Sequence, residues 1–322
     1  MFKELTKNII VNENQGYAFY FYNNGKIIEK TNGVVKEEQS EKITFDSNFR
    51  LASVSKQFIA FAIVKLIKEN KLSYDQNVKT IFNELPFYFE KITIKHLLNH
   101  TSGILNYEDM SHTDEQIHDE DIIKFLKTTD KTYFEPGLTY KYSNTGYILL
   151  GLIIKKVSNR DLVDYIENEV FIPAKMYESK VNIEGATNIK NRAYGHILND
   201  DKLVVKDQYW CSATIGDGGL YSSVNELKKW VKYLLTTKEY QDMKIPNYIN
   251  EESYNEYGIG IRITKVNDKE IIYHCGDTIG TNTLLLFSVD YNICLIFLTN
   301  LNNINTTTMK ENLLTLIKEN KL

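Results

Sequence analysis

The sequence has little of what marks export, membrane insertion or metal binding. Its three cysteines, Cys211, Cys275 and Cys294, are far apart and odd in number, so they form neither a metal-ligand spacing nor a disulfide framework. No uncharged apolar stretch approaches the roughly 20 residues that cross a bilayer, and the first residues lack the apolar run of a signal peptide. We therefore expect no membrane span and, for the chain as given, a cytoplasmic location. A trimmed precursor of an exported protein would have the same sequence, so the location stays open.

Positive charge is not concentrated anywhere either. The chain has 38 Lys and Arg against 42 Asp and Glu, a formal net charge of -4, and its basic residues are scattered. This pattern argues against a nucleic-acid partner or a membrane surface recognised by charge. His112 and His118 stand among acidic residues, and a solvated loop explains them better than a metal site. We expect no metal and no cofactor.

Pro/Gly-rich linkers, internal repeats and low-complexity tracts are also lacking. With 322 residues and 43% hydrophobic residues, the chain can form one large domain or two smaller ones. Its 22 tyrosines fit strand and core packing. The composition is that of an ordinary globular protein.

The distribution of apolar residues predicts strands near both ends and helices between them. The expected strands are 17–22 and 26–29, joined by the Asn24-Gly25 turn, and 257–263, 270–273, 283–287 and 293–298. Helices are expected from Ser53, over most of 93–175, over 223–234 after a Ser-x-x-Glu capping box, and over 306–322. This order predicts an α+β fold with one sheet built from both ends and a helical insertion.

Ser53-Val54-Ser55-Lys56 is the only Ser-x-x-Lys motif in the chain. On a helix, this spacing places the Ser and Lys side chains on one face, about 5–6 Å apart at Cβ. The lysine could then draw the proton from the serine hydroxyl, and the helix N-terminus would favour an oxyanion beside it. Alone the motif is weak, because about one or two chance matches are expected in such a chain. A helix cap followed by a surface lysine is the alternative.

Further segments accompany the motif in a fixed order. They are Leu97-Leu98-Asn99-His100-Thr101-Ser102-Gly103, Glu135-Pro136-Gly137 with Tyr142-Ser143-Asn144, Gly216-Asp217-Gly218-Gly219, and His274-Cys275-Gly276-Asp277. The ordered set closely resembles the class C β-lactamase branch of the serine β-lactamase and penicillin-binding protein superfamily. That branch also contains D-alanyl-D-alanine carboxypeptidases, D-aminopeptidases and esterases. The resemblance runs from about Gly16 to the last strand.

The resemblance implies the β-lactamase/transpeptidase-like fold, an antiparallel sheet flanked by helices plus a helical lobe. It implies a single catalytic domain over residues 1–322. The α/β lobe would comprise about 1–85 and 200–322, and the helical lobe about 86–199. The active site would lie in the cleft between the lobes.

The resemblance also implies roles for individual residues. Ser53 would be the acylated nucleophile, and Lys56 its proton acceptor or electrostatic partner. Tyr142 would assist acylation and the activation of water as a phenolate or hydrogen-bond relay. Asn144 would hold Lys56 and a substrate carbonyl.

The third motif, His274-Cys275-Gly276, would line the cleft from a strand. The backbone N–H groups of Ser53 and Asp277 would form the oxyanion hole, which is often the largest catalytic contribution in such enzymes.

A purely structural role is also open to some of these residues. Tyr142 could be one more packing tyrosine, and Tyr140 is its rival, although only Tyr142 has Asn at the required spacing. His100 could act as a base, but the resemblance makes it a scaffold residue. Asp217 could be either a turn residue or a cleft residue, and the sequence does not decide between them.

Three departures bear on the substrate. Cys275 stands where relatives that bind a substrate carboxylate usually have Thr, and His274 stands in place of Lys. Asp277 adds a negative charge close by. We therefore expect a preference for uncharged esters or amides.

The sequence predicts a serine hydrolase that cleaves an amide or ester of a small molecule or peptide through a Ser53 acyl-enzyme. Its activity would be that of a β-lactamase, a D-Ala-D-Ala carboxypeptidase, an aminopeptidase or an esterase. The alternative is a penicillin-recognising sensor or degenerate binding protein with slow or no turnover. The sequence does not indicate the oligomeric state.

Overall fold

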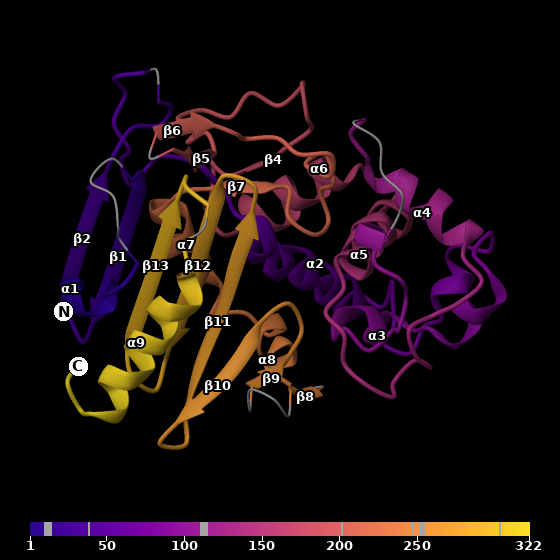
Figure 1. The fold of residues 1–322 in the computed structure, drawn as a ribbon. Helices are drawn as coiled ribbons and strands as arrows, with labels where there is room; N and C mark the ends of the chain where they lie inside the picture. Colours follow the sequence, from indigo (N-terminus) through magenta and orange to yellow (C-terminus); the bar gives the residue numbers. More distant parts are fainter. Residues whose placement is uncertain are drawn as a thin grey trace.

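An antiparallel sheet brings the two ends of the chain together. The computed structural model describes residues 1–9, 15–37, 39–109, 115–200, 202–245, 248–250, 255–302 and 304–322. Within these residues eight strands form the sheet, in the order β2-β1-β13-β12-β11-β10-β9-β8 (Figure 1). They are β1 (Tyr17–Asn23), β2 (Lys26–Asn32), β8 (Tyr248–Asn250), β9 (Asn255–Tyr257), β10 (Arg262–Val266), β11 (Lys269–Thr278), β12 (Thr281–Ser288) and β13 (Ile293–Thr299). β1 and β13 are neighbours, with Phe19 opposite Phe297.

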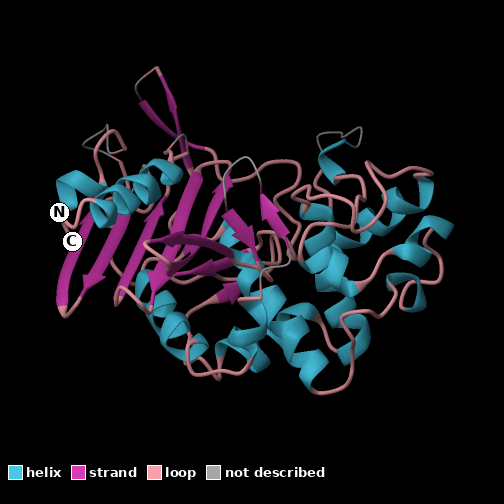
Figure 2. Ribbon diagram, turned by 90° about the horizontal axis from the view of Figure 1, so that it is seen from below, coloured by secondary structure: helices cyan, strands magenta, loops and turns pink. Residues whose placement is uncertain are grey.

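Helices cover both faces of this sheet (Figure 2). Along β12, Leu284 and Leu286 belong to one apolar core and Leu285 and Phe287 to the other, because successive side chains of a strand point to opposite faces. α1 (Phe2–Leu5) and α9 (Thr306–Lys318) cover the first face. α2 (Lys56–Lys68), α7 (Val224–Leu234) and α8 (Glu239–Met243) lie on the second. Burial on both faces explains why residues 284–287 of β12 are apolar without alternation.

The helical side of the molecule is built around α2. Trp230 of α7 packs on Phe58 and Phe61 of α2. The other helices here are α3 (Ile94–Leu98), α4 (Asp119–Thr128), α5 (Asn144–Ser158) and α6 (Leu162–Ile166), with the π-helical turn η5 (Glu167–Phe171). The 3₁₀ turns are η1 (Ala52–Ser55), η2 (Val78–Thr80), η3 (Phe87–Lys91) and η4 (Tyr107–Asp109). α2 therefore lies between the sheet and the remaining helices.

Short strands join the two sides of the molecule. β3 (Phe49–Arg50), β7 (Leu220–Ser222) and β4 (Lys180–Val181) form a small sheet in the order β3-β7-β4, and β5 (His196–Asn199) pairs with β6 (Lys202–Val205). Residues 180–199, which the sequence assigned to the helical lobe, thus pair partly with segments of the other lobe. The predicted boundaries at 85/86 and 199/200 remain a prediction. No helix formed by the described residues is long and apolar enough to cross a bilayer.

The structure confirms the predicted α+β order and corrects two elements. The expected strand 257–263 is wrong in its middle, because β9 ends at Tyr257 and β10 begins only at Arg262. Between them the chain bends at Gly260 (φ +71°), where a Cβ would lie 2.7 Å from the Lys56 carbonyl oxygen. The helix expected from Ser53 begins as the 3₁₀ turn η1, and the α-helix starts at Lys56.

Candidate active site

Ser53 lies on the 3₁₀ turn η1, which enters α2 directly. The residue before it, Ala52, has φ +47°, a left-handed conformation that is uncommon for a residue with a side chain. Gly276 of β11 packs against this turn so closely that a Cβ there would lie 2.2 Å from the Leu51 carbonyl oxygen. The turn thus fixes the serine beside the strand that carries the third motif.

Lys56 is fully buried and directed at Ser53. Its Nζ donates to Ser53 Oγ (3.1 Å), Asn144 Oδ1 (2.8 Å) and the backbone carbonyl of Asp217 (2.7 Å). These three acceptors match the three N–H bonds of an ammonium group. The structure therefore brings Ser53, Lys56 and Asn144 together, although they come from η1, α2 and α5.

The segment before α5 is held by His100. The buried His100 accepts the Ser143 backbone N–H at Nδ1 (3.0 Å), and the Ser143 hydroxyl caps α5 through the Gly146 N–H (3.1 Å). Burial, with the positive charges of Lys56 and Arg262, lowers the pKa of His100 well below 6.5. A neutral acceptor is what the Ser143 contact requires, so His100 supports the site as a scaffold residue.

Tyr142 lies between cations. Its ring centroid is 5.0 Å from Lys56 Nζ and 5.4 Å from the Arg262 guanidinium carbon. Its hydroxyl makes no hydrogen bond to any residue in the described part of the chain. Tyr142 lines one groove together with Ser53. This position is compatible with the predicted proton-handling role, which stays a prediction.

The third motif has a neutral histidine. His274 is held through Nδ1 at the Cys275 carbonyl oxygen (2.7 Å) and through Nε2 at the Tyr257 hydroxyl (3.4 Å). Burial, then the charges of Arg262 and Lys56, lowers its pKa well below 6.5. His274 therefore supplies no positive charge near neutral pH. Asp277 lines the same cavities as Ser53, as the predicted oxyanion hole requires, and burial raises the pKa of its carboxyl.

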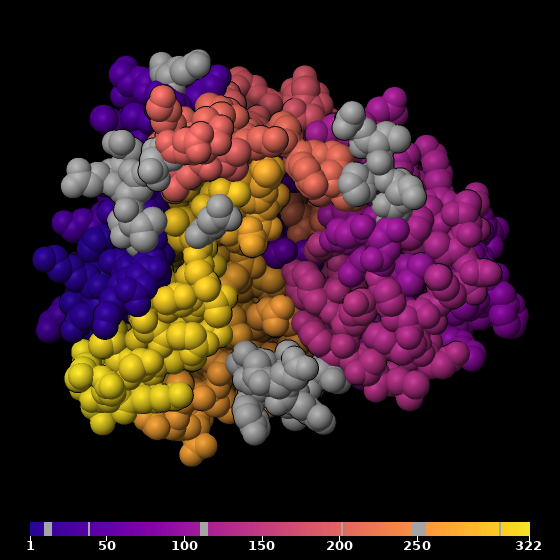
Figure 3. Space-filling view, in the orientation of Figure 1, coloured from indigo at the N-terminus to yellow at the C-terminus, as the bar shows by residue number. Residues whose placement is uncertain are grey.

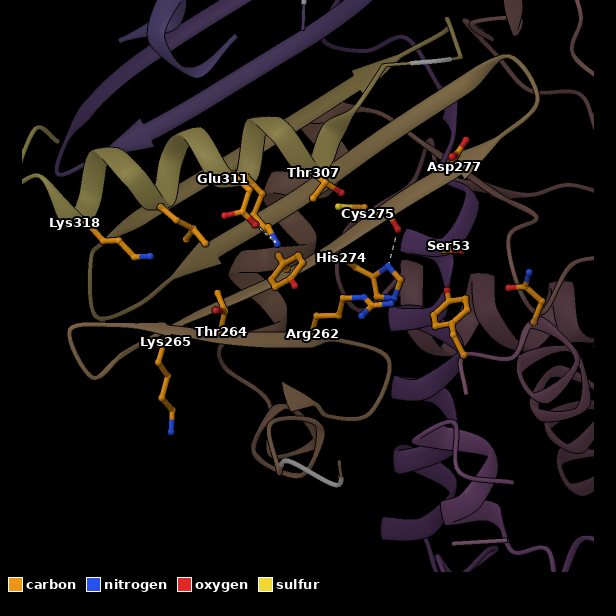
Figure 4. Close-up of a pocket in the computed structure, with 15 residues that line it drawn as sticks. Ser53, Arg262, Thr264, Lys265, His274, Cys275, Asp277, Thr307, Glu311 and Lys318 are labelled. Atoms are coloured by element: carbon orange, nitrogen blue, oxygen red, sulfur yellow. Dashed lines mark hydrogen bonds and ion pairs between the residues drawn. The ribbon is translucent and has the colours of Figure 1, made fainter. Parts of the chain in front are cut away.

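A groove of about 850 Å³ runs from Ser53 along β10, β11 and α9. The space-filling view shows a hollow between the orange and yellow surface of the sheet side and the magenta helical side (Figure 3). Figure 4 shows Arg262 beside His274, and Thr307 beside Cys275. Arg262, Lys265, Lys310 and Lys318 line the groove, against the carboxylates Asp277 and Glu311.

Arg262 is one of the residues of this groove that the sequence analysis did not predict. It stands opposite Tyr273 in the β10–β11 register, next to the His274 motif. β10 begins at Arg262 because the chain bends at Gly260, where it contacts α2. The spacing of the sequence motifs does not predict that contact. The only sequence feature that could have indicated a role for Arg262 is its position directly after the Gly-x-Gly-x pattern of residues 258–261.

A second cavity, of about 210 Å³, is also lined by Ser53 and Asn144, together with Glu108 and Asp217. The structure gives Asp217 both of the roles between which the sequence did not decide. Its carbonyl oxygen holds Lys56, and its carboxylate accepts a hydrogen bond from Tyr107 (3.0 Å), so it is both a loop residue and a cleft residue. Glu108 accepts from the Asn144 amide (2.5 Å), and no sequence motif pointed to it.

Of the two histidines considered as a possible metal site, the structure describes only His118. His118 precedes α4 and forms a capping box with Asp121, while His112 lies outside the described residues. In the described part of the chain, no group of three or more His, Cys, Asp or Glu side chains converges.

Comparison with known proteins places this site in a family. The family model described as Beta-lactamase matches residues 7–317. The chain belongs to the β-lactamase family. It is 30% identical over 292 residues to penicillin-binding protein 4* of Bacillus subtilis, covering 82% of this chain and 63% of that protein. The chain thus spans less than two thirds of the length of the curated relatives it matches first.

Solved structures of the family have the same fold. The octameric penicillin-binding protein homologue of Pyrococcus abyssi is 26% identical, with a TM-score of 0.81 over 94% of this chain and 74% of that chain. D-amino acid amidase of Ochrobactrum anthropi is 21% identical, with a TM-score of 0.78 over 95% of this chain and 94% of that chain. The β-lactamase/transpeptidase-like fold expected from the sequence is confirmed.

Proposed function

We propose that the chain is a serine hydrolase that cleaves an amide or ester through an acyl-enzyme on Ser53. The observation that carries this proposal is the buried Lys56 ammonium, which donates to Ser53 Oγ and to two further acceptors. A buried lysine without a carboxylate partner is a costly structural element. Its position beside a serine of the β-lactamase family is explained by catalysis.

The geometry supports a division of roles in acyl transfer. Ser53 Oγ forms the bond to the substrate carbonyl carbon, and the bond to the leaving nitrogen or oxygen breaks. All three Lys56 protons are engaged, so Lys56 can accept the Ser53 proton only after losing one of its own. We propose that Tyr142, whose ring centroid lies 5.0 Å from Lys56 Nζ and whose hydroxyl has no partner among the described residues, exchanges that proton and passes it to the leaving group. Water then releases the acyl group in a second step.

Intact-mass analysis after exposure to a fluorophosphonate, a penicillin and an activated ester tests the proposal. We expect one adduct per chain, mapped to Ser53, and none in Ser53→Ala. A label on Ser55 or Ser143 would contradict it. Stable acylation by penicillin without release of product would instead favour a penicillin-recognising sensor.

We propose a substrate preference that differs from the one expected from the sequence. That expectation rested on Cys275, His274 and Asp277, and it did not include Arg262. The Cys275 thiol lies beside the hydroxyls of Thr306 and Thr307, and Thr307 also lines the groove. A guanidinium and a hydroxyl are therefore present where an anion would bind. We propose that the leaving-group side of the substrate carries a carboxylate or another anion.

Paired substrates test this second point. We expect kcat/KM for an acyl ester with a carboxylate on its leaving group to exceed that of its neutral analogue about tenfold. Arg262→Met should reduce this ratio, whereas Lys269→Met, at the distant start of β11, should leave it unchanged. A higher kcat/KM for the neutral analogue would restore the preference expected from the sequence, and equal rates would contradict both expectations.

A further inference from the structure

A further groove, of about 670 Å³, lies between α7 and the sheet, and we call it the α7 groove. Side chains of three neighbouring strands line it in a row. Tyr22 of β1 stands opposite Cys294 of β13, and Cys294 stands opposite Phe287 of β12. Burial raises the pKa of the Cys294 thiol to about 12, so this side chain is uncharged near neutral pH. The row is therefore an uncharged floor.

The floor continues into an adjoining cavity of about 330 Å³. Phe287 stands opposite Ile272 of β11, which lines this second cavity together with Tyr240 of α8. Leu235 and Val289 line both spaces and are 37% and 62% exposed. Adjacent strands lie about 4.8 Å apart, so a row across four strands is about 14 Å long. The two spaces together form an elongated path with exposed apolar side chains at its middle.

The α7 groove has positive charge without a carboxylate among the described residues that line it. Its two cations, Lys228 and Lys232, are one helical turn apart on the same side of α7. Lys228 Nζ lies 4.8 Å from the Tyr20 ring centroid and 3.5 Å from a carboxylate oxygen of Glu29. Lys232 makes no hydrogen bond or ion pair with a described residue. Its ammonium group is therefore available to an anion.

The adjoining cavity has the opposite charge. Glu270 and Asp290 line it, and its one cation among the described residues, Lys244, is paired with Glu270 (3.2 Å). An anion is therefore attracted to the α7 end of the path and repelled from the other end. Such a path is complementary to an elongated molecule that has an anionic head and an uncharged apolar tail.

We propose that the α7 groove binds a long-chain carboxylate, with its head at Lys228 and Lys232 and its tail along the floor toward Ile272. The carboxylate would form charge-assisted hydrogen bonds with the two ammonium groups. The tail would cover apolar side chains that are otherwise exposed to water. The volume of the groove is that of an ordinary ligand pocket. No described residue of the α7 groove lines the cavities at Ser53, so this site is separate from the proposed hydrolase site.

Calorimetric titration with dodecanoate, below the concentration at which it forms micelles, tests the head and the tail of the ligand. We expect one site per chain, with dodecanoate bound at least about tenfold more tightly than dodecanol, which lacks the charge, and than hexanoate, which has a short tail. Lys228→Met combined with Lys232→Met should weaken binding at least about tenfold. Lys238→Met, at an exposed lysine outside the groove, is the control and should leave binding unchanged. Equal affinity for dodecanoate and dodecanol would overturn the proposal.

Further variants locate the bound molecule. Leu235→Glu adds a negative charge where the two cavities meet and should abolish binding, whereas Leu138→Glu, at an exposed position elsewhere, should not. Both side chains are partly in solvent, and thermal unfolding checks that each variant folds. Ser53→Ala and Arg262→Met should bind dodecanoate normally, because neither residue lines the α7 groove.

Two results would refute this location. Loss of dodecanoate binding in Arg262→Met would place the carboxylate in the catalytic groove instead. Association with phosphatidylglycerol vesicles without binding of monomeric dodecanoate would indicate attraction to a membrane surface rather than a site for a single molecule. Neither result depends on acylation of Ser53, so failure of this proposal and failure of the hydrolase function are distinguishable.

Discussion

At the scale of single residues, the buried Lys56 charge acts on its neighbours. Burial, joined by the charges of Arg262 and Lys56, lowers the pKa of both His100 and His274 well below 6.5. Both histidines are therefore neutral near pH 7. The site has its fixed positive charge on Lys56 and Arg262, and its histidines serve as hydrogen-bonding and packing groups.

Tyr142→Phe tests the proton-handling role. We expect turnover to fall by about 10²–10⁴-fold, the usual range for a lost acid-base group. The thermal midpoint should change little, because the hydroxyl makes no hydrogen bond to a described residue. Steady-state kinetics with thermal unfolding measure both. Tyr140→Phe is the matched control and should lower kcat only slightly. A near-normal kcat in Tyr142→Phe would contradict the proton-handling role of Tyr142.

The sequence could predict only some of the residues now found in the site. Ser53 and Lys56 are three positions apart, so local helical geometry predicts their contact, and the resemblance supplied Tyr142 and Asn144. Arg262 and Glu108 reach the site through the β10–β11 register and the turn η4. Such contacts depend on tertiary packing, which no motif spacing records. The roles of Tyr142, His274 and Asp277 in catalysis stay predictions.

At the scale of elements, the contact between β11 and η1 sets the geometry at the nucleophile. A Cβ on Gly276 would lie 2.2 Å from the Leu51 carbonyl oxygen and 2.3 Å from Thr283 Oγ1. Gly276→Ala must therefore push β11 away from η1. We expect kcat to fall at least about 100-fold and the free energy of unfolding to fall by about 1–3 kcal/mol. Kinetics with urea unfolding measure the two effects.

Gly146→Ala is the control for this substitution. A Cβ on Gly146 would have its nearest neighbour at 3.6 Å, an ordinary contact, and the residue lies in the first turn of α5. Alanine favours a helix over glycine by up to about 1 kcal/mol. We expect unchanged or slightly raised stability and near-normal kcat. Equal losses in both variants would contradict a specific role of the β11–η1 contact.

Two strands that the sequence predicted well, β12 and β13, are buried on both faces. Helices cover both faces of the sheet there, so residues 284–287 of β12 and 293–298 of β13 form apolar runs, which the sequence shows as strands. The bend between β9 and β10 was missed because its residues have the apolar character of a strand. The contact of Gly260 with the first turn of α2 and the hydrogen bond from the Gly258 N–H to the Ile261 carbonyl oxygen (3.0 Å) interrupt the strand there.

At the scale of the whole molecule, global stability should depend on Asp119 at the start of α4. Its Oδ1 accepts from the Ile215 N–H (2.8 Å), at the loop that delivers the Asp217 carbonyl to Lys56. Burial raises the pKa of Asp119 from 3.8 to about 8. Between pH 3.8 and about pH 8, the Asp119 carboxyl is protonated in the folded protein and deprotonated in the unfolded chain. The contribution of Asp119 to the free energy of unfolding is therefore fully present below about pH 3.8 and is lost as the pH rises toward 8.

Asp119→Asn removes this dependence while keeping an oxygen acceptor. Relative to wild type, the variant should gain about 1.4 kcal/mol of unfolding free energy per pH unit as the pH rises. The gain should level off above about pH 8, where the carboxyl is deprotonated in both the folded and the unfolded wild type. Urea unfolding from pH 5 to 9 measures it, and a difference independent of pH would contradict it.

The pairing of β1 with β13 also has a consequence during synthesis on the ribosome. Tyr17 pairs with Thr299, so the centre of the sheet joins segments separated by nearly the whole chain. Until β13 emerges, the β1–β2 hairpin has an unpaired edge, and its partner surface does not yet exist. Contacts of such long sequence separation slow folding, and exposed strand edges invite aggregation in the meantime. The nascent protein should therefore depend on chaperones until the last strand is released.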